Sequence, residues 1–218
     1  SDLTEGFSRV LMRRIQALRK NAGLENNNKI ILYVIMSAGM VSLAVLGEPG
    51  VLYDLDKLVY LGSPYSTYHA VFVSRKEAGL SNLEKLRSVP GVRIGGQSVG
   101  FSTYNEGRLF AYLLGLKEPK FVTGYSGVEI DLALLRGEVD ARANNPDMIL
   151  RRNRDWIDKG LVDFHAILEI PKGDKHPAFT HLPELEEFAK ADKEQKLLAL
   201  QRASGSQRGE ICDRIFGS

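Results

Sequence analysis

The chain has 218 residues, of which 29 are basic and 27 acidic, giving a formal net charge of +2, and hydrophobic residues make up 44% of it. This composition excludes an intrinsically disordered chain, which needs low hydrophobicity and high net charge, and argues against a dedicated nucleic-acid binder, which carries a concentrated basic excess. The single cysteine, Cys212, rules out an intramolecular disulfide and a cysteine-rich zinc site.

The first part of the chain is predicted to hold an amphipathic helix and then an apolar segment. Apolar residues spaced by three or four, from Phe7 to Leu18, predict a helix that ends near Gly23. The charge-free run over 30–46 is at the short limit for a membrane span, which needs about 20 apolar residues. We therefore interpret it as a buried strand over 30–36, a turn, and a short helix over 40–46.

Strands and helices alternate through the rest of the chain. Strands are expected over 58–62, 69–74, 92–94, 120–123, 139–141 and 164–168. Helices are expected after an N-cap at Ser81 with Glu84 as its capping-box partner, and over 103–114, 128–136 and 184–203. In the third of these, Val128, Leu132 and Leu135 form the apolar stripe. This alternation predicts an α/β protein with a mainly parallel sheet.

A glycine-rich turn, Gly95-Gly96-Gln97-Ser98-Val99-Gly100, follows the strand over 92–94. Glycines let backbone N–H groups approach a ligand closely, and a helix start capped by Ser102 or Thr103 adds unpaired donors and a positive dipole end. The pattern predicts a site for a phosphate or a carboxylate. An ordinary strand–helix turn without a ligand is the alternative.

The same turn also matches G-x-S-x-G, the nucleophile elbow of α/β hydrolases, with Ser98 as nucleophile. Possible partners follow in the hydrolase order: Asp140 or Asp163, then His165, His176 or His181. However, no oxyanion segment of the HGGG type precedes the turn, and none of these histidines lies in a recognisable motif. Nucleotide-binding glycine motifs and metal-ligand spacings are absent from the sequence, so we expect no cofactor and no metal.

Two further motifs carry a family resemblance. One is V-x-G-Y-x-G, formed by Val122, Gly124, Tyr125 and Gly127, and the other is the run Arg-Gly-Glu-Val-Asp over 136–140. Together with the glycine-rich turn, and more weakly with the segments 5–11, 46–54 and 176–190, they resemble the Bug-type substrate-binding receptors of tripartite tricarboxylate transporters.

This resemblance implies a type 2 periplasmic-binding-protein-like fold, with two α/β lobes around a cleft. Lobe 1 is expected over 1–95 and 183–218, and lobe 2 over 96–182. The family's first strand, its glycine-rich loop and its long closing region have no counterpart here, so a trimmed or reduced receptor is expected. The ligand would be a small carboxylate held by backbone amides and small polar side chains. The candidate ligand-binding residues are Ser37, Gln97, Ser98, Gly100, Ser102, Thr103 and Asn144.

The resemblance also implies a role for the chain. It would be a non-enzymatic, periplasmic, monomeric receptor whose signal peptide has been removed. Its partners would be a small carboxylate and the membrane subunits of a transporter, with no nucleic acid. The alternatives are a serine hydrolase using Ser98 and the ligand-sensing half of a bacterial regulator, although no helix-turn-helix segment is found.

Overall fold

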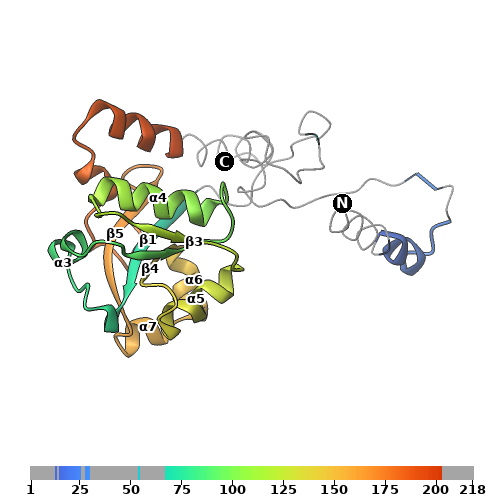
Figure 1. Ribbon diagram of the computed structural model, residues 1–218. Helices are drawn as coiled ribbons and strands as arrows, with labels where there is room; N and C mark the ends of the chain where they lie inside the picture. The colour runs from blue at the N-terminus through green and yellow to red at the C-terminus, as the bar shows by residue number, and fades with distance from the viewer. Residues whose placement is uncertain (1–12, 14, 26–27, 30–53, 55–66, 203–218) are drawn as a thin grey trace. The chain divides into compact units, whose positions relative to one another are not determined.

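The computed structural model of the protein describes residues 13, 15–25, 28–29, 54 and 67–202 (Figure 1). The chain divides into two units, 1–55 and 56–218. In the first unit, residue 13 and residues 15–21 are helical and Gly23 has a φ of +68°, which confirms this part of the predicted helix. The predictions for 30–46 and 58–62, and the candidate ligand residue Ser37, lie outside the described residues.

The second unit is built on a five-stranded sheet in the order β3-β2-β4-β1-β5 (Figure 1). β2 runs parallel to both β3 and β4, whereas β1 runs antiparallel to both β4 and β5. The predicted mainly parallel sheet is therefore correct for β2, β3 and β4 and wrong for β1, which is antiparallel to both of its neighbours. The strands are β1 (Tyr68–Arg75), β2 (Arg93–Gly95), β3 (Lys120–Val122), β4 (Ala141–Asn144) and β5 (Val162–Ile170).

Helices cover both faces of this sheet (Figure 1). On one face, α4 (Ser102–Leu114) packs its Phe110 ring against Phe72 of β1 at 5.4 Å between ring centroids. The same core takes in side chains of α3 (Leu83–Ser88), η3 (Leu185–Phe188) and a helix over 192–202. On the other face lie α5 (Gly127–Arg136), α6 (Pro146–Arg152) and α7 (Asp155–Asp158), around the buried Trp156. The short helix η2 (Lys76–Ala78) follows β1.

The helix predictions need three corrections. Asn82, not Ser81, caps α3, because its side chain accepts a hydrogen bond from the backbone N–H of Lys85. The helix expected over 184–203 is broken into η3 and the helix over 192–202. The helices α6 and α7 and the short helix η2 were not predicted at all.

The apolar stripe predicted on α5 faces solvent. Val128, Leu132 and Leu135 are 53%, 45% and 43% exposed, whereas α5 buries Ile130 and Leu134 completely. The sequence carries two apolar stripes on this helix, and the sheet selects the one that includes β-branched Ile130, which packs over Gly95.

The predicted lobe boundary at residue 95 coincides with the end of β2, inside the sheet. Because β1 pairs with β4 and β5, this one sheet joins residues assigned to both lobes. The α/β class is confirmed, and the division into lobes stays a prediction.

Candidate functional site

The carboxyl ends of four strands lie along one edge of the sheet. β2, β3 and β4 are parallel to one another, and β5 has the direction of β4 because both are antiparallel to β1. In open α/β sheets, ligands bind in the crevice outside the carboxyl ends of the strands. The glycine-rich turn, after β2, and Asn144, at the end of β4, both lie along this edge.

Two glycines bring the turn into close contact with the helices on either side. A Cβ atom on Gly95 would lie 2.8 Å from Cγ2 of Ile130 in α5, and one on Gly96 would lie 3.3 Å from the Tyr104 side chain in α4. Gly100 then adopts a φ of +84°, a conformation that L side chains rarely take. The turn is therefore a packed feature of the fold as well as a candidate binding loop.

Gln97 is the best-anchored candidate in this turn. Its side-chain Oε1 accepts a hydrogen bond from Oγ1 of Thr103 at 3.1 Å, and its backbone carbonyl accepts one from the N–H of Gly124 at 2.7 Å. These contacts leave the Gln97 amide NH₂ group as a donor without an acceptor among residues 67–202. The hydroxyls of Ser98 and Ser102 likewise make no hydrogen bond within that range, and Ser98 is exposed. The structure thus brings together five of the seven candidates: Gln97, Ser98, Gly100, Ser102 and Thr103.

The helices α4, α5 and α6 begin at this edge, and in α5 and α6 the N-cap side chain accepts a hydrogen bond from a backbone N–H of the first turn. In α5, Ser126 and Glu129 form a reciprocal capping box. In α6, the side-chain oxygen of Asn145 accepts a hydrogen bond from the N–H of Met148 at 3.1 Å. Both helices also carry an acidic residue in the first turn, Glu129 and Asp147 respectively.

The start of α4 is different. Its N-cap is Phe101, which supplies no side-chain hydrogen bond, and its first turn has no acidic residue. The expectation that Ser102 or Thr103 caps the helix is wrong, because both lie inside the first turn. Within the described part of the chain, the N–H groups of residues 102–104 have no acceptor. Unpaired donors and the positive end of the helix dipole suit an anion.

Asn144, the sixth candidate, is tied into a buried network on the α5 side. Its Nδ2 donates to Asp131 at 3.2 Å, and its Oδ1 accepts from the N–H of Asn145 at 2.9 Å. Asp131 also pairs with Arg142, whose guanidinium is buried, and with Asn153. Burial lowers the pKa of Arg142, and the adjacent Asp131 opposes this effect. These contacts fix the Asn144 side chain at the end of β4, and its role as a ligand-binding residue stays a prediction.

Residues of the two family-like motifs make contacts around β2 and at the two ends of α5. Asp140 accepts two hydrogen bonds from the guanidinium of Arg93, at 2.9 and 2.7 Å, and a third from the backbone N–H of Arg93 at 3.1 Å. Burial of Asp140 raises its pKa, but these bonds and the charge of Arg93 outweigh burial and lower it overall. Tyr125 of the first motif donates to Glu138 of the second at 3.3 Å. Each motif therefore supplies contacts within the fold.

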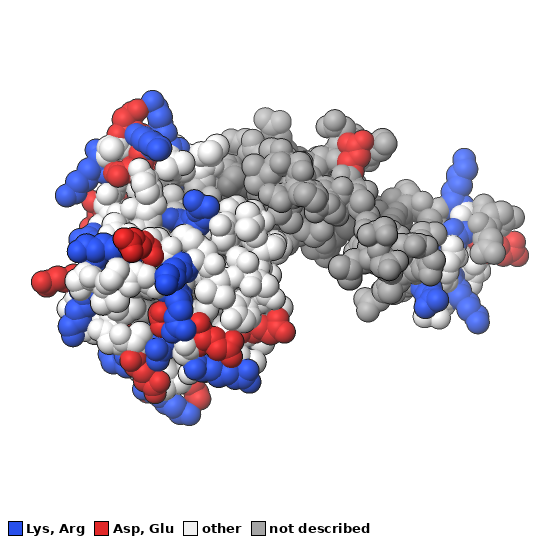
Figure 2. All heavy atoms as spheres, in the orientation of Figure 1, with Lys and Arg blue, Asp and Glu red and all other residues white. Residues whose placement is uncertain are grey.

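The surface around the sheet carries mixed charges. On the face shown in Figure 2, basic and acidic side chains alternate and neither sign forms a continuous patch. An anion at the α4 start would therefore be held by local N–H and hydroxyl donors, without a basic patch on this face.

The hydrolase arrangement is not assembled around Ser98. Among the described residues, no histidine contacts Ser98; instead Nε2 of His165 is 2.8 Å from Oγ of Ser74, a pair buried between β1 and β5. The described ranges also hold no cluster of three or more His, Cys, Asp or Glu side chains arranged for a metal ion. No helix within these ranges is long and apolar enough to cross a membrane.

Comparison with known proteins finds similar folds among solved structures. No protein-family model matches the chain, and no curated protein matches it in sequence. Among solved structures, MatC from Rhodopseudomonas palustris with bound malate matches with a TM-score of 0.53 and 17% identity, over 83% of this chain and 66% of MatC. The periplasmic binding protein BugD matches with a TM-score of 0.52 and 14% identity, over 83% and 64%. A TctC solute-binding protein from Polaromonas, solved without ligand, matches with a TM-score of 0.50 and 13% identity, over 81% and 65%.

These matches confirm the predicted resemblance at the level of the fold. The structure shares the fold of tricarboxylate-type periplasmic solute-binding proteins, and the chain spans just under two thirds of the length of each of these three.

Proposed function

We propose that this chain is a non-enzymatic, periplasmic receptor that captures a small carboxylate for a membrane transporter. The bound carboxylate would lie at the start of α4, against the turn formed by residues 97–103. The N–H groups of residues 102–104, the amide of Gln97 and the hydroxyls of Ser98 and Ser102 would donate to its oxygens.

The observation that carries this proposal is the difference between the three helix starts. Only α4, among the helices that begin at the carboxyl edge of the described sheet, has a first turn without a side-chain cap and without an acid. Backbone and hydroxyl donors can bind a carboxylate there without a basic side chain. The malate bound in MatC, a protein of the same fold, supports a carboxylate as the ligand class. The division into two lobes, the monomeric state and the transporter partner are part of the same proposal.

The proposal is tested by ligand binding to the full chain. Malate and other di- and tricarboxylates should raise the melting temperature and give a binding isotherm in calorimetry, whereas the uncharged diamide of malate should not. The substitution Thr103→Val removes the hydrogen bond that orients Gln97, so the affinity should fall about fivefold. Thr180→Val, at an exposed position in the turn after residue 178, is the matched control and should leave the affinity unchanged.

The hydrolase alternative predicts the opposite pattern. The receptor proposal is wrong if none of the carboxylates raises the melting temperature and the chain hydrolyses an ester in a reaction that Ser98→Ala abolishes. Binding of carboxylates by the Ser98→Ala variant, with no ester turnover in either protein, supports the receptor.

A further inference from the structure

The outer side of α5 carries a line of apolar side chains that the core of the described residues does not use. Val128, Leu132 and Leu135 lie on this exposed side, whereas Ile130 and Leu134 are completely buried against the sheet. Single exposed apolar side chains are common on protein surfaces, but a contiguous set indicates an interaction surface. We call Val128, Leu132 and Leu135 the α5 stripe.

The spacing of the α5 stripe is that of a seam between two helices. Its residues are separated by four and then three positions, the repeat that aligns the core residues of a coiled coil. Two opposite charges flank the stripe on one side, because Glu129 follows Val128 and Arg136 follows Leu135 at the same offset. The stripe and its flank therefore match a second amphipathic helix.

The stripe and its flanking charges are complementary to a second copy of themselves. When another α5 lies antiparallel across a two-fold axis at Leu132, Val128 of each copy meets Leu135 of the other. The same alignment places Glu129 of each copy opposite Arg136 of the other. A two-fold interface requires this reciprocity, and opposite charges beside a helix seam favour one partner and one orientation.

Both charged side chains are available to a partner. Glu129 accepts the backbone N–H of Ser126 with Oε2 at 2.6 Å, and its Oε1 makes no hydrogen bond within the described part of the chain. Hydrogen bonds from Ser126 lower the pKa of Glu129, so its carboxylate is charged at neutral pH. The Arg136 side chain is 68% exposed, and its contact with Glu138 is loose, at 3.9 Å.

A parallel second copy fits less well. It would bring Arg136 next to Asp131 on the other flank of the seam. Asp131 already pairs with the buried Arg142 and accepts a hydrogen bond from Asn153 at 2.8 Å. An antiparallel copy also brings opposite ends of the two helix dipoles together.

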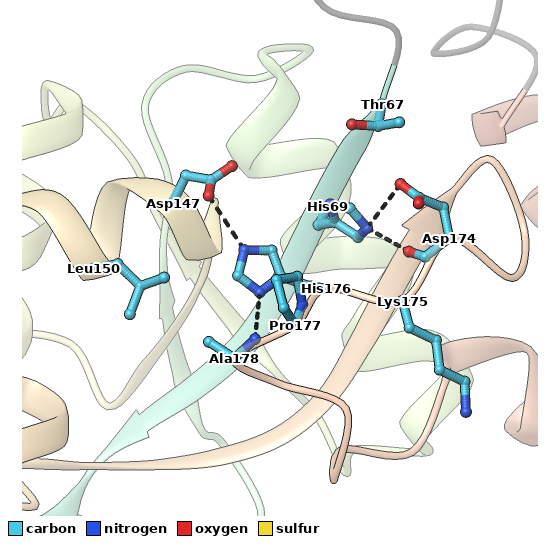
Figure 3. Close-up of a pocket in the computed structure, with 9 residues that line it drawn as sticks. All are labelled: Thr67, His69, Asp147, Leu150, Asp174, Lys175, His176, Pro177 and Ala178. Carbon is cyan, nitrogen blue, oxygen red and sulfur yellow. Dashed lines mark hydrogen bonds and ion pairs between the residues drawn. The ribbon is translucent and has the colours of Figure 1, made fainter.

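The hollow beside α6 is a contrasting surface (Figure 3). It is lined by residues 174–178, the start of β1 and part of α6. His69 contacts Asp174 there, and His176 contacts Asp147. These polar side chains satisfy one another within the chain, so the hollow gives no comparable reason to expect a partner.

We propose that the α5 stripe is a dimer interface, on which a second copy of this chain packs its own α5 in the antiparallel direction. Three apolar side chains from each copy make a far smaller interface than permanent dimers have, so the association is weak and depends on concentration. The monomeric state included in the proposed function is the dilute end of this equilibrium. The dimer does not depend on ligand binding.

Sedimentation equilibrium of the full chain over a range of concentrations tests the interface. The wild type should show a monomer–dimer equilibrium. Leu132→Glu should weaken the dimer about tenfold or more, because two carboxylates would meet at the axis. Leu200→Glu is the matched control, since Leu200 is 69% exposed on the helix over 192–202, and it should leave the equilibrium unchanged.

Cysteine cross-linking tests the orientation. With Cys212→Ser as the background, Leu132→Cys should form a disulfide-linked dimer under mild oxidation, because this residue meets its own counterpart at the axis. Val128→Cys should not cross-link, because in the antiparallel dimer it lies opposite Leu135 and far from its own counterpart. In a parallel dimer both variants would cross-link.

Three results would overturn the proposal. A wild type that sediments as a monomer at every concentration would assign the α5 stripe to another occupant, and a dimer that Leu132→Glu leaves intact would lie on another face. Cross-linking of Val128→Cys as readily as Leu132→Cys would contradict the antiparallel arrangement. If Leu132→Glu does not fold, cross-linking of Leu132→Cys decides the first question. Malate binding is measured separately, so its absence would contradict the proposed function and leave the dimer result standing.

Discussion

At the scale of single residues, the glycine-rich turn shows that one residue type serves two purposes. Gly100 provides a backbone conformation with positive φ, whereas Gly95 provides space for the side chains of Ile130 and Val139. Both requirements produce a glycine in the sequence. Glycine spacing therefore predicts the turn correctly but does not say which glycine shapes the loop and which one allows α5 to pack.

Gly95→Ala should destabilise the protein by about 1–3 kcal/mol. Its Cβ would lie 2.8 Å from Ile130 and 3.2 Å from Val139, and neither neighbour is at the flexible end of a long side chain. The free energy of unfolding in urea measures the effect. Gly127→Ala is the matched control, because nothing lies within 4 Å of the Cβ it would add and its φ is not positive. Equal stability of the two variants would contradict this account of the turn.

At the scale of elements, the sequence predicts the existence of helices and strands better than their contacts. The spacing of apolar residues predicted α5 correctly but indicated the wrong buried side, the one with Val128 and Leu132. The helix has two apolar stripes, and the sequence does not show which of them packs against the sheet. The short helix α6 was missed, since its seven residues contain too few apolar positions for a period. Its sequence signals, Asn145 as N-cap and Pro146 at the first helical position, could have indicated it.

Arg202 ties the helix over 192–202 to η3 and β5. Arg202 donates to Glu184 and Glu186, each at 2.8 Å, and to the carbonyl oxygen of Glu169 at 3.2 Å. Hydrogen bonds from Lys172 and Arg202 lower the pKa of Glu186. Pairing two carboxylates at partly buried positions makes this contact stronger than an isolated surface pair.

Arg202→Ala should release this helix from the sheet. We expect amide hydrogen exchange over 192–202 to become about tenfold faster or more, while the strands keep their protection, because two partly buried carboxylates lose their partner. Lys196→Ala is the control, since Lys196 pairs with Asp192 where both side chains are at least 77% exposed. Similar exchange in both variants would show that apolar contacts such as that of Leu198 hold the helix alone.

At the scale of the whole molecule, stability should depend on pH through His165. Burial lowers the pKa of this histidine from 6.5 to about 4, and the charge of Asp163 opposes the shift. Between pH 6.5 and about pH 4, His165 is protonated in the unfolded chain and neutral in the folded protein. The unfolded state therefore binds more protons in this window, and the free energy of unfolding decreases as the pH falls.

When the pH is lowered from 7.5 to 4.5, His165 should decrease the free energy of unfolding by about 2–3 kcal/mol. Urea unfolding of the wild type and of His165→Asn at both pH values measures the contribution as the difference between their pH dependences. The exposed His181 provides a comparison, because His181→Asn should keep the wild-type dependence. An unchanged pH dependence in His165→Asn would show that this ring is already protonated in the folded protein at pH 4.5.

The whole-molecule expectations from sequence were correct where they depended on local motifs. The α/β class, the loop after β2 and the likeness to solute-binding proteins follow from short segments with defined turns. The direction of β1 and the engagement of Asn144 by Asp131 depend on partners distant in sequence. Neither can be derived from spacing within one segment.

The pair formed by Arg93 and Asp140 separates the identity of the fold from the choice of solute. The run that carries the family resemblance ends in Asp140, which joins β2 to the segment leading into β4 through its bonds to Arg93. Under the proposed function, exchanging exposed side chains such as Ser98 would alter the ligand contacts and leave the Arg93–Asp140 pair in place. The residues that carry the resemblance would then report the architecture of such a chain, and the residues of the turn over 97–103 would report its ligand.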